Sequence, residues 1–373
     1  MKKVDIAVIG GGMAGAATAL GLVREGAGNV VMFDEQLPTQ RLSRGNFGLT
    51  WFMCKGANNP VYARWSRMST MMWPEFAAKL EEESGYNIEL EWNGGALHAM
   101  GTEQFQAYAD SVETLKKVCS DDGLDYPVRM LDRAEFAAMV PDMQLGEEVT
   151  GAMYSAEQGH VNPLPLLAAL RCAFQKRGGS YFGGLNVSAV VPQGDGTTIV
   201  ITSQGSYQCE KLVIAAGHGS SRLLATLGHK LHVYQQRGQL MVTERAKRVL
   251  RFPILAVRQT VDGTFMIGLS TEDTAHDAHV TIEAMKSQAS NAIKLFPELG
   301  KLNWVRGWGA IRIMTPDGGP IYDRLPDQKN IYILTGHSAV TLAPAMTHHI
   351  ARWILEKEEA PQISHFGNGR FNV

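Results

Sequence analysis

The chain has 373 residues, of which 45% are hydrophobic and 19% are charged. This length favours two domains, and the apolar fraction is enough for a large core. The formal net charge of -2 does not suggest a nucleic acid or an anionic membrane as a partner.

Cysteine and apolar patterns limit the function further. The cysteines are scattered and form no CxxC pair: Cys54, Cys119, Cys172 and Cys209. No zinc or iron–sulfur site is therefore expected, and free thiols fit a reducing compartment. We expect no metal at His348 and His349, because adjacent helical residues do not share a face. No run reaches about eighteen uninterrupted apolar residues, so we expect a cytoplasmic chain without a transmembrane segment.

The chain opens on an apolar strand at residues 4–9, a glycine turn and a helix. The turn has the pattern G-x-G-x-x-G, and Asp34 closes a second apolar strand nineteen residues beyond it. Such glycines let a pyrophosphate approach the helix N-terminus, and the acidic residue binds a ribose hydroxyl. The pattern predicts a dinucleotide site formed by Gly10, Gly12, Met13, Ala14, Gly15, Asp34 and Glu35.

The next elements no longer alternate as strand, helix and strand. Residues 41–60 are irregular and rich in aromatic side chains. A helix is expected over 60–84, which Pro74 should kink or split. Strands around a glycine turn follow at 89–100, and helices are expected at 102–120 and 133–139.

The second half returns to the first pattern. A helix at 164–176 leads to a hairpin formed by 187–191 and 198–203, and 211–217 is expected to be a buried parallel strand. Alternating residues over 233–271 predict antiparallel sheet, followed by a helix at 281–296. The last elements are a strand at 331–334, a glycine turn and a helix at 344–356.

This order predicts an α/β protein with a discontinuous nucleotide-binding domain. The domain is expected to comprise residues 1–85, 150–225 and 319–373. An antiparallel-sheet α+β domain is expected to be inserted twice, as residues 86–149 and 226–318.

Five ordered motifs resemble those of the D-amino-acid oxidase superfamily of flavoproteins, which includes glycine oxidase, sarcosine oxidase and opine oxidase. After the glycine turn come L-V-I-A-A-G at 212–217, R-G-Q at 237–239, W-G-A-I-R at 308–312 with T-P-D-G-G-P-I at 315–321, and G-H-S-A-V-T-L-A-P at 336–344. Ala310 stands where the family has a glycine. The ending with Arg370 and Phe371 looks most like the opine oxidase and hydroxyproline dehydrogenase branch.

The resemblance implies a Rossmann-like FAD-binding domain of the glutathione-reductase type and an inserted substrate domain. It implies noncovalent FAD, because residues 311–314 lack the cysteine that tethers flavin in sarcosine oxidases. Further FAD-binding residues are expected in three regions: Arg41, Ser43, Arg44, Gly45 and Asn46; Val187, Ala216 and Gly217; and Gly336, His337, Ser338, Val340, Thr341 and Leu342.

Two of these regions also have simpler interpretations. The segment after Gly336 is a second junction between a strand and a helix, where backbone N–H groups would stabilise an anionic flavin edge. The alternative is an ordinary helix N-cap at Thr341. For residues 41–46 the alternative is a solvated basic loop.

The resemblance also implies an activity. We expect oxidation of the C–N bond of a small amino acid or N-substituted amino acid, by hydride transfer to flavin N5. The resulting imine would hydrolyse to an oxo acid and an amine or ammonia. Arg312 would clamp the substrate carboxylate, with a structural salt bridge as its alternative. Arg258 is a second cation expected to face the site, and His337 is either a polar neighbour of the flavin or a core histidine.

Three functions stay open. The chain is an oxidoreductase that works alone or as a homo-oligomer, a flavin-carrying subunit of a hetero-oligomeric opine-oxidase-like or hydroxyproline-dehydrogenase-like complex, or a nicotinamide-dependent dehydrogenase. No lysine has an obvious position for activating O2, so the sequence leaves open whether O2 or another molecule accepts the electrons.

Overall fold

One sheet joins segments from the start, the middle and the end of the chain. The computed structural model describes residues 1–35, 42–121, 123–273, 277–358 and 361–372. Strand β1 (Lys2–Ile9) pairs in parallel with β2 (Val30–Asp34) and with β11 (Gly205–Ile214). The sheet continues beyond these two to β8 (Ser180–Gly183), β17 (Ile331–Thr335) and β16 (Ile321–Arg324).

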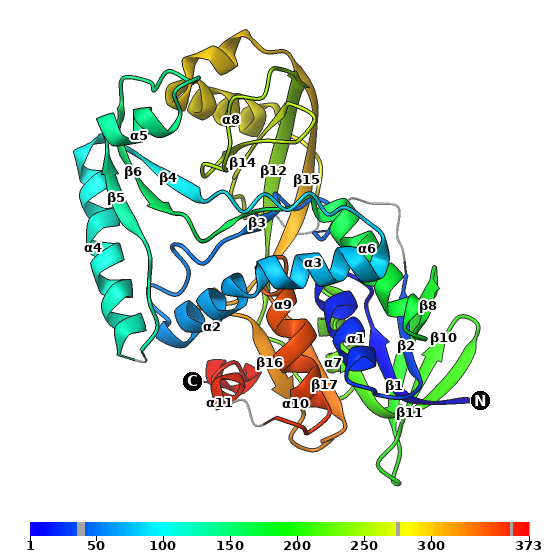
Figure 1. Cartoon of the computed structure of the whole chain (residues 1–373). Coiled ribbons are helices and arrows are strands. Elements are labelled where there is room, and N and C mark those ends of the chain that lie inside the picture. The colour runs from blue at the N-terminus through cyan, green and yellow to red at the C-terminus, as the bar shows by residue number, and fades with distance from the viewer. Residues whose placement is uncertain (36–41, 122, 274–276, 359–360, 373) are drawn as a thin grey trace.

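The two faces of this sheet are covered differently. Side chains alternate along β1, so that Ile6 and Val8 join one apolar cluster and Ala7 and Ile9 join another. The first cluster includes α1 (Met13–Arg24), α3 (Trp73–Ser84) and α6 (Pro163–Lys176), which lie together in Figure 1. The second includes α7 (Gly219–Ala225) and the predicted hairpin, β9 (Val187–Pro192) with β10 (Thr198–Thr202).

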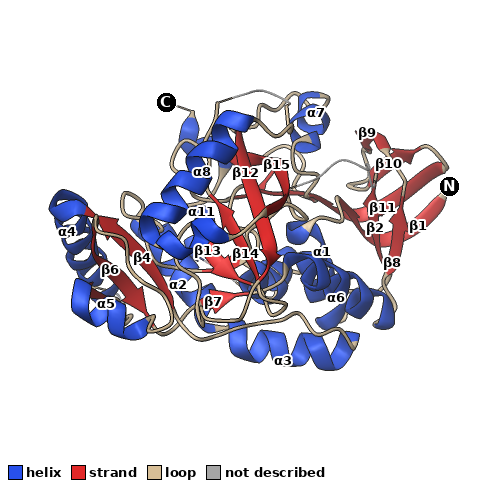
Figure 2. Ribbon diagram, turned by 90° about the horizontal axis from the view of Figure 1, so that it is seen from above, coloured by secondary structure: helices blue, strands red, loops and turns tan. Residues whose placement is uncertain are grey.

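Two antiparallel sheets form the other half of the molecule, separate from the β1 sheet in Figures 1 and 2. One has the order β13 (Val257–Gln259), β14 (Thr264–Gly268), β12 (Tyr234–Arg245) and β15 (Trp304–Met314). The other has the order β4 (Gly95–Met100), β6 (Val149–Ser155) and β5 (Arg129–Asp132). Their shared core also contains α5 (Arg133–Met139), α8 (Ile282–Leu295) and the 3-10 helix η1 (Pro297–Lys301), while α4 (Gly101–Ser120) packs on β4 and β6.

The domain division remains a prediction. Strand β6 pairs with β4 and β5, so strand pairing favours a boundary after residue 155 rather than at 150.

Two helical expectations are refined by the structure. The helix expected over 60–84 is split into α2 (Pro60–Met71) and α3, with Pro74 in the first turn of α3. Proline is tolerated there because that N–H has no partner within a helix. The last predicted helix consists of α9 (Ala343–Ala345), the π-helical η2 (Met346–Ile350) and α10 (Ala351–Ile354).

Some short elements were not expected. The strand pattern at 89–100 begins only at Gly95, while β3 (Leu49–Thr50) pairs with β7 (Gly159–His160). The chain closes with α11 (Pro361–Ser364) and η3 (Asn368–Phe371). Among the described helices, none has the length and apolar character needed to cross a membrane.

Candidate functional site

The glycine turn after β1 is held tightly between strand and helix. Gly10 has a φ of +108°, and a Cβ on it would overlap the carbonyl oxygen of Ala215, the residue just after β11. A Cβ on Gly15 would overlap the carbonyl oxygen of Gly10. Gly12, the N-cap of α1, forms no side-chain cap, and Ser43 Oγ lies 2.9 Å from the N–H of Met13. Apart from the contact of Met13 with Ser43, this helix start has no side-chain cap and can receive an anion such as a pyrophosphate.

The acidic residue beyond the turn is fixed by a side chain that the sequence motifs did not indicate. Asp34 is 6% exposed, and Arg171 of α6 donates to its Oδ2 at 3.0 Å. The Nε of Arg171 also donates to the carbonyl oxygen of Gly11 at 2.9 Å, and its guanidinium lies over the ring of Tyr181. The available signal was a lone arginine within the apolar part of α6.

The loop after β17 has an unusual backbone. Gly336 has a φ of +126° and Ser338, although not a glycine, has a φ of +69°. His337 Nδ1 lies 2.9 Å from Ser338 Oγ. Left-handed backbone at a non-glycine residue costs about 1–3 kcal/mol and is often found at functional sites.

Thr341 is not the N-cap that one alternative required. The helix is capped by Leu342, without a side-chain bond. The hydroxyl of Thr341 instead accepts from Lys55 Nζ at 2.7 Å and donates to the carbonyl oxygen of Leu49 at 3.2 Å. Its carbonyl oxygen accepts from Ser69 Oγ and Trp73 Nε1.

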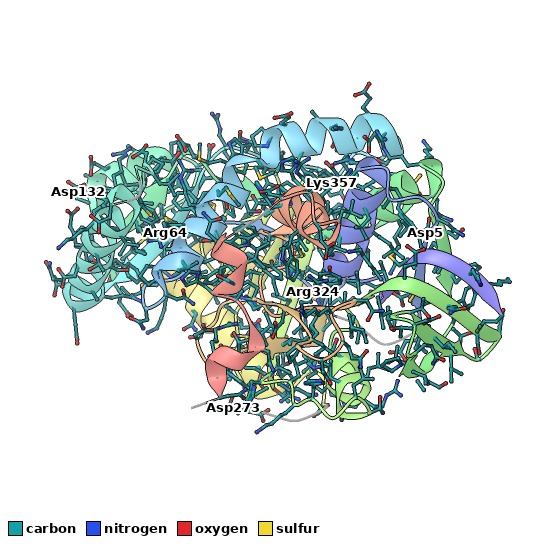
Figure 3. The ribbon with its side chains drawn as sticks, turned by 90° about the horizontal axis from the view of Figure 1, so that it is seen from below. Asp5, Arg64, Asp132, Asp273, Arg324 and Lys357 are labelled. Atoms are coloured by element: carbon teal, nitrogen blue, oxygen red, sulfur yellow. The ribbon has the colours of Figure 1, made fainter. Side chains whose placement is uncertain are left out.

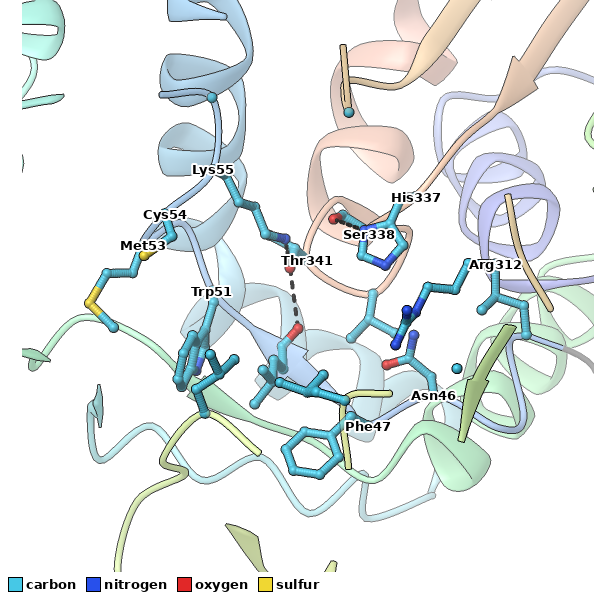
Figure 4. Close-up of a pocket in the computed structure, with 18 of the residues that line it drawn as sticks. Asn46, Phe47, Trp51, Met53, Cys54, Lys55, Arg312, His337, Ser338 and Thr341 are labelled. Carbon is cyan, nitrogen blue, oxygen red and sulfur yellow. Dashed lines mark hydrogen bonds between the residues drawn. The ribbon is translucent and has the colours of Figure 1, made fainter. Parts of the chain in front are cut away.

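This loop forms one wall of a cavity of about 510 Å³, shown in Figure 4. The cavity brings together seven of the residues predicted to bind cofactor or substrate. These are Gly45, Asn46, Arg312, His337, Ser338, Val340 and Thr341.

Arg312 lies on β15, opposite Gln236 of β12. Its Nη1 lies 3.4 Å from Gln236 Oε1. A Cβ on Gly238 would overlap the guanidinium, so the glycine of the R-G-Q motif makes room for it. Within the described ranges no carboxylate oxygen lies within 4.0 Å of Arg312, and the structural salt bridge is therefore not formed there. Burial lowers the pKa of Arg312, and the charge of Glu272 offsets only part of this shift.

Lys55 is the second cation in the cavity, and no sequence motif pointed to it. It lies on the segment after β3 and bonds Thr341, which is 286 residues away in sequence. Burial lowers the pKa of Lys55 to about 7. The available signal was a lone cation in the aromatic and small-residue run 51–56.

His337 lies near both cations in the cavity. Burial, and then the charges of Lys55 and Arg312, lower the pKa of His337 to about 3. The imidazole is therefore neutral at pH 7, and it can take part in hydrogen bonds without carrying charge.

The expectation that Arg258 faces the site is wrong. Arg258 is buried, its Nε donates to the carbonyl oxygen of Phe47 at 2.7 Å, and its Nη1 lies 3.1 Å from His160 Nδ1. Phe47 lines the cavity but Arg258 does not. The arginine therefore positions the Phe47 backbone from behind.

The other predicted cofactor residues that the structure describes do not line this cavity. Ala216 is close to Gly10, and Gly217 turns the chain with a φ of +60°. Glu35 accepts from Asn186 Nδ2 at 3.2 Å, and the carbonyl oxygen of Val187 accepts from Arg222 at 3.0 Å. Met13 and Leu342 are buried, whereas Ala14 and Arg44 are half-buried. Arg41 lies outside the described residues.

The argument against a shared face for His348 and His349 does not hold in the π-helical turn. Ligand atoms of both rings and of Glu358 lie within 4.8 Å of one another. The Glu358 carboxylate is already bound by His349 at 2.8 Å and by Arg352 at 3.0 Å. Hydrogen bonding thus explains the cluster without a metal.

Comparisons with known proteins agree with this fold. A family model described as FAD dependent oxidoreductase matches residues 5–353. One subunit of the opine oxidase of Rhizobium meliloti is 32% identical, over 100% of this chain and 99% of that protein. The crystal structure of glycine oxidase from Geobacillus kaustophilus superposes with a TM-score of 0.89 at 24% identity, covering 99% of each chain. That of L-proline dehydrogenase from P. horikoshii gives 0.87 at 20% identity, covering 100% of this chain and 98% of that one.

Proposed function

This chain belongs to the family of FAD-dependent oxidoreductases, and from that membership we propose that it oxidises the C–N bond of a small amino acid or N-substituted amino acid. The observation that carries the proposal is the cavity in which Arg312 faces the loop that follows Gly336. A guanidinium that has no carboxylate partner among the described residues suits a substrate carboxylate, and the loop suits a flavin edge.

The residues present fit FAD. The pyrophosphate would lie on the glycine turn at the start of α1, and the ribose would bond Asp34, whose carboxylate has several acceptor positions. The flavin ring would lie against Gly45, Asn46 and the loop at 336–342. We propose noncovalent attachment because residues 311–314 carry no cysteine.

FAD, when bound, supplies an acceptor for the hydride from the substrate carbon that bears nitrogen. Arg312 would hold the carboxylate through two parallel N–H groups, which orients that carbon as well as binding it. Neutral His337 would offer a hydrogen bond without opposing the substrate amine by charge. The imine product would then react with water to give an oxo acid and an amine or ammonia, and O2 or another acceptor would take the electrons.

The test begins with the purified chain. We expect a flavin absorption spectrum with one FAD per chain, and release of the flavin on acid precipitation. Retention of flavin in the precipitate would contradict noncovalent binding and would direct attention to Cys54, which lines the cavity. A protein that binds a nicotinamide cofactor and no flavin would contradict the function itself.

The substrate is then found by anaerobic bleaching of the flavin. The panel comprises glycine, sarcosine, D-amino acids, proline derivatives, iminodiacetate and opines. We expect bleaching by at least one amine that carries a carboxylate, and none by matched amines that lack it. Bleaching by amines irrespective of a carboxylate would contradict the role of Arg312.

A second candidate function is a flavin-carrying subunit of a hetero-oligomeric opine-oxidase-like complex. Identities of 32% and 33% to the same opine oxidase subunit from two bacteria, each over the whole chain, support it. In that case the isolated chain would be reduced by substrate but would turn over poorly with a dye acceptor. Efficient turnover by the isolated chain would favour the first function. The free thiols support a cytoplasmic location for either one.

A further inference from the structure

The cavity contains two cationic side chains without a carboxylate partner. Lys55 and Arg312 both line it, and in the part of the chain that the structure describes no carboxylate oxygen lies within 4.0 Å of either. Their polar partners are uncharged, Thr341 Oγ1 and Gln236 Oε1. Both side chains are half-buried, and withdrawing a charge from water without a counterion is costly, so the cavity suits a ligand that brings negative charge.

Nearby carboxylates are already neutralised elsewhere. Asp317 lines the cavity, but Arg370 binds its two oxygens at 2.9 and 3.0 Å and Asn59 donates to it as well. Glu272, which acts on Arg312 through its charge, is paired with Arg237 at 2.6 Å. Because each acid is paired with another arginine, neither Asp317 nor Glu272 neutralises the charges of Lys55 and Arg312.

The two cations enter the cavity from different elements. Lys55 comes from the segment after β3 and Arg312 from β15, and Figure 4 shows them on opposite sides of the pocket with His337 between them. Exposed charges such as Asp132 and Asp273 lie instead at the edges of the molecule in Figure 3. The arrangement suits a ligand with an anionic group at each end, rather than two anions at one point.

We propose that Lys55 binds a second carboxylate, and that the substrate is a secondary amine with one carboxylate on each side of its nitrogen. This inference rests on the proposed function, in which Arg312 holds the carboxylate beside the oxidised carbon. Lys55 then holds the carboxylate of the N-substituent and is a specificity-determining residue. A lysine ammonium suits this task because it acts as a compact point charge on a flexible stem.

Iminodiacetate and sarcosine test the inference, because they differ by one carboxylate. We expect anaerobic flavin reduction in the holoprotein to favour iminodiacetate in kcat/KM by about tenfold or more, the effect of one charge-assisted hydrogen bond. Lys55→Met should lower kcat/KM for iminodiacetate about tenfold more than for sarcosine, and Lys55→Arg should restore part of the difference. The control is Lys116→Met, since Lys116 is exposed on α4. Equal losses with both substrates, or no preference in the unaltered protein, would overturn the inference.

Dead-end ligands separate this inference from the proposed function. Diglycolate and methoxyacetate have an ether oxygen in place of the amine and cannot be oxidised at a C–N bond. Calorimetry on the holoprotein should show tighter binding of diglycolate, and Lys55→Met should remove that advantage. If diglycolate binds in this way while no amine reduces the flavin, the proposed function fails and the role of Lys55 stands. If Lys55→Met weakens both ligands equally, the role of Lys55 fails.

Discussion

At the scale of single residues, Lys55 is the group in the cavity whose charge changes near neutral pH. Burial lowers its pKa to about 7. The other charged or titratable groups that line the cavity are Cys54, Tyr62, Arg312, His337 and Asp317, and Thr341 bonds Lys55 directly. Burial, and then the charges of Lys55 and Arg312, lower the pKa of His337 to about 3. Burial raises the pKa of Asp317, but Arg370 lowers it by more, so the net shift is downward. Burial raises the pKa of Cys54 and that of Tyr62 to about 12. None of these groups changes charge near pH 7.

Binding of a second carboxylate should therefore depend on pH. A carboxylate stabilises the ammonium form, so above pH 7 binding requires uptake of a proton by Lys55. The Kd of diglycolate should rise with pH, by up to about tenfold per unit, whereas that of methoxyacetate should rise less. Calorimetry between pH 6 and about 9, repeated with Lys55→Met, measures this. A Kd for diglycolate that does not change over this range would contradict the assignment.

Arg312 makes a separate prediction at the same scale. Arg312→Ala should lower kcat/KM for a carboxylate substrate, because a desolvated charged pair is lost. The loss of transition-state stabilisation should exceed about 2 kcal/mol. Arg312→Lys should restore only part of this, since an ammonium lacks the planar fork. Steady-state kinetics or anaerobic flavin reduction measures the effect. Unchanged kinetics would exclude the carboxylate clamp.

At the scale of elements, β1, α1 and the residues after β11 meet closely at the proposed dinucleotide site. Gly15→Ala places a methyl group on the carbonyl oxygen of Gly10 and must push α1 away from the turn. We expect a loss of about 1–3 kcal/mol in unfolding free energy, typical of overpacking, together with lower FAD occupancy. Chemical denaturation and the ratio of flavin to protein absorbance measure both.

Gly194 offers a matched control for this substitution. A Cβ at Gly194 meets no atom within 4 Å, and the residue lies in the exposed turn between β9 and β10. Gly194→Ala should change stability by less than about 0.5 kcal/mol and leave FAD occupancy unchanged. Similar losses in the two variants would show that crowding at Gly15 is not the cause.

At the scale of the whole molecule, the C-terminal segment holds a loop of the cavity. Arg370 binds both oxygens of Asp317 and the carbonyl oxygens of Phe366 and Pro320. Asp317 lines the cavity. Arg370 therefore stabilises a cavity wall that lies 53 residues before it in the sequence.

Arg370→Ala should therefore reduce stability and raise KM. The pair is partly exposed, and we expect about 1 kcal/mol at pH 7. The pKa of Asp317 is lowered from 3.8, so this contribution is present above pH 3.8 and disappears as the pH falls through the lowered value. Denaturation of both proteins at pH 7 and in acid measures the difference. A deficit that grows in acid would contradict this account.

Much of the fold follows from local patterns along the chain. The glycine turn before α1, the apolar β1 and the position of Pro74 each act on immediate neighbours, through backbone sterics and side-chain alternation. The family motifs likewise placed Arg312 and the loop at 336–342 in the site, and seven predicted residues do line one cavity.

What local patterns could not reveal depends on distant pairings. Lys55 and Thr341 meet across 286 residues, and Arg171 reaches Asp34 across 137. The sequence predicts that Arg258 lies on a strand, and it does lie on β13. Only the packing of β13 against Phe47 shows that its guanidinium points away from the cavity.

The sequence by itself predicted a dinucleotide site on the first strand, turn and helix, because those constraints act over a few residues. The family motifs added that the dinucleotide is FAD. Only the tertiary structure decided which charges share the cavity. A side chain is buried, paired or left without a counterion by the elements that pack around it, and here those elements come from both ends of the chain.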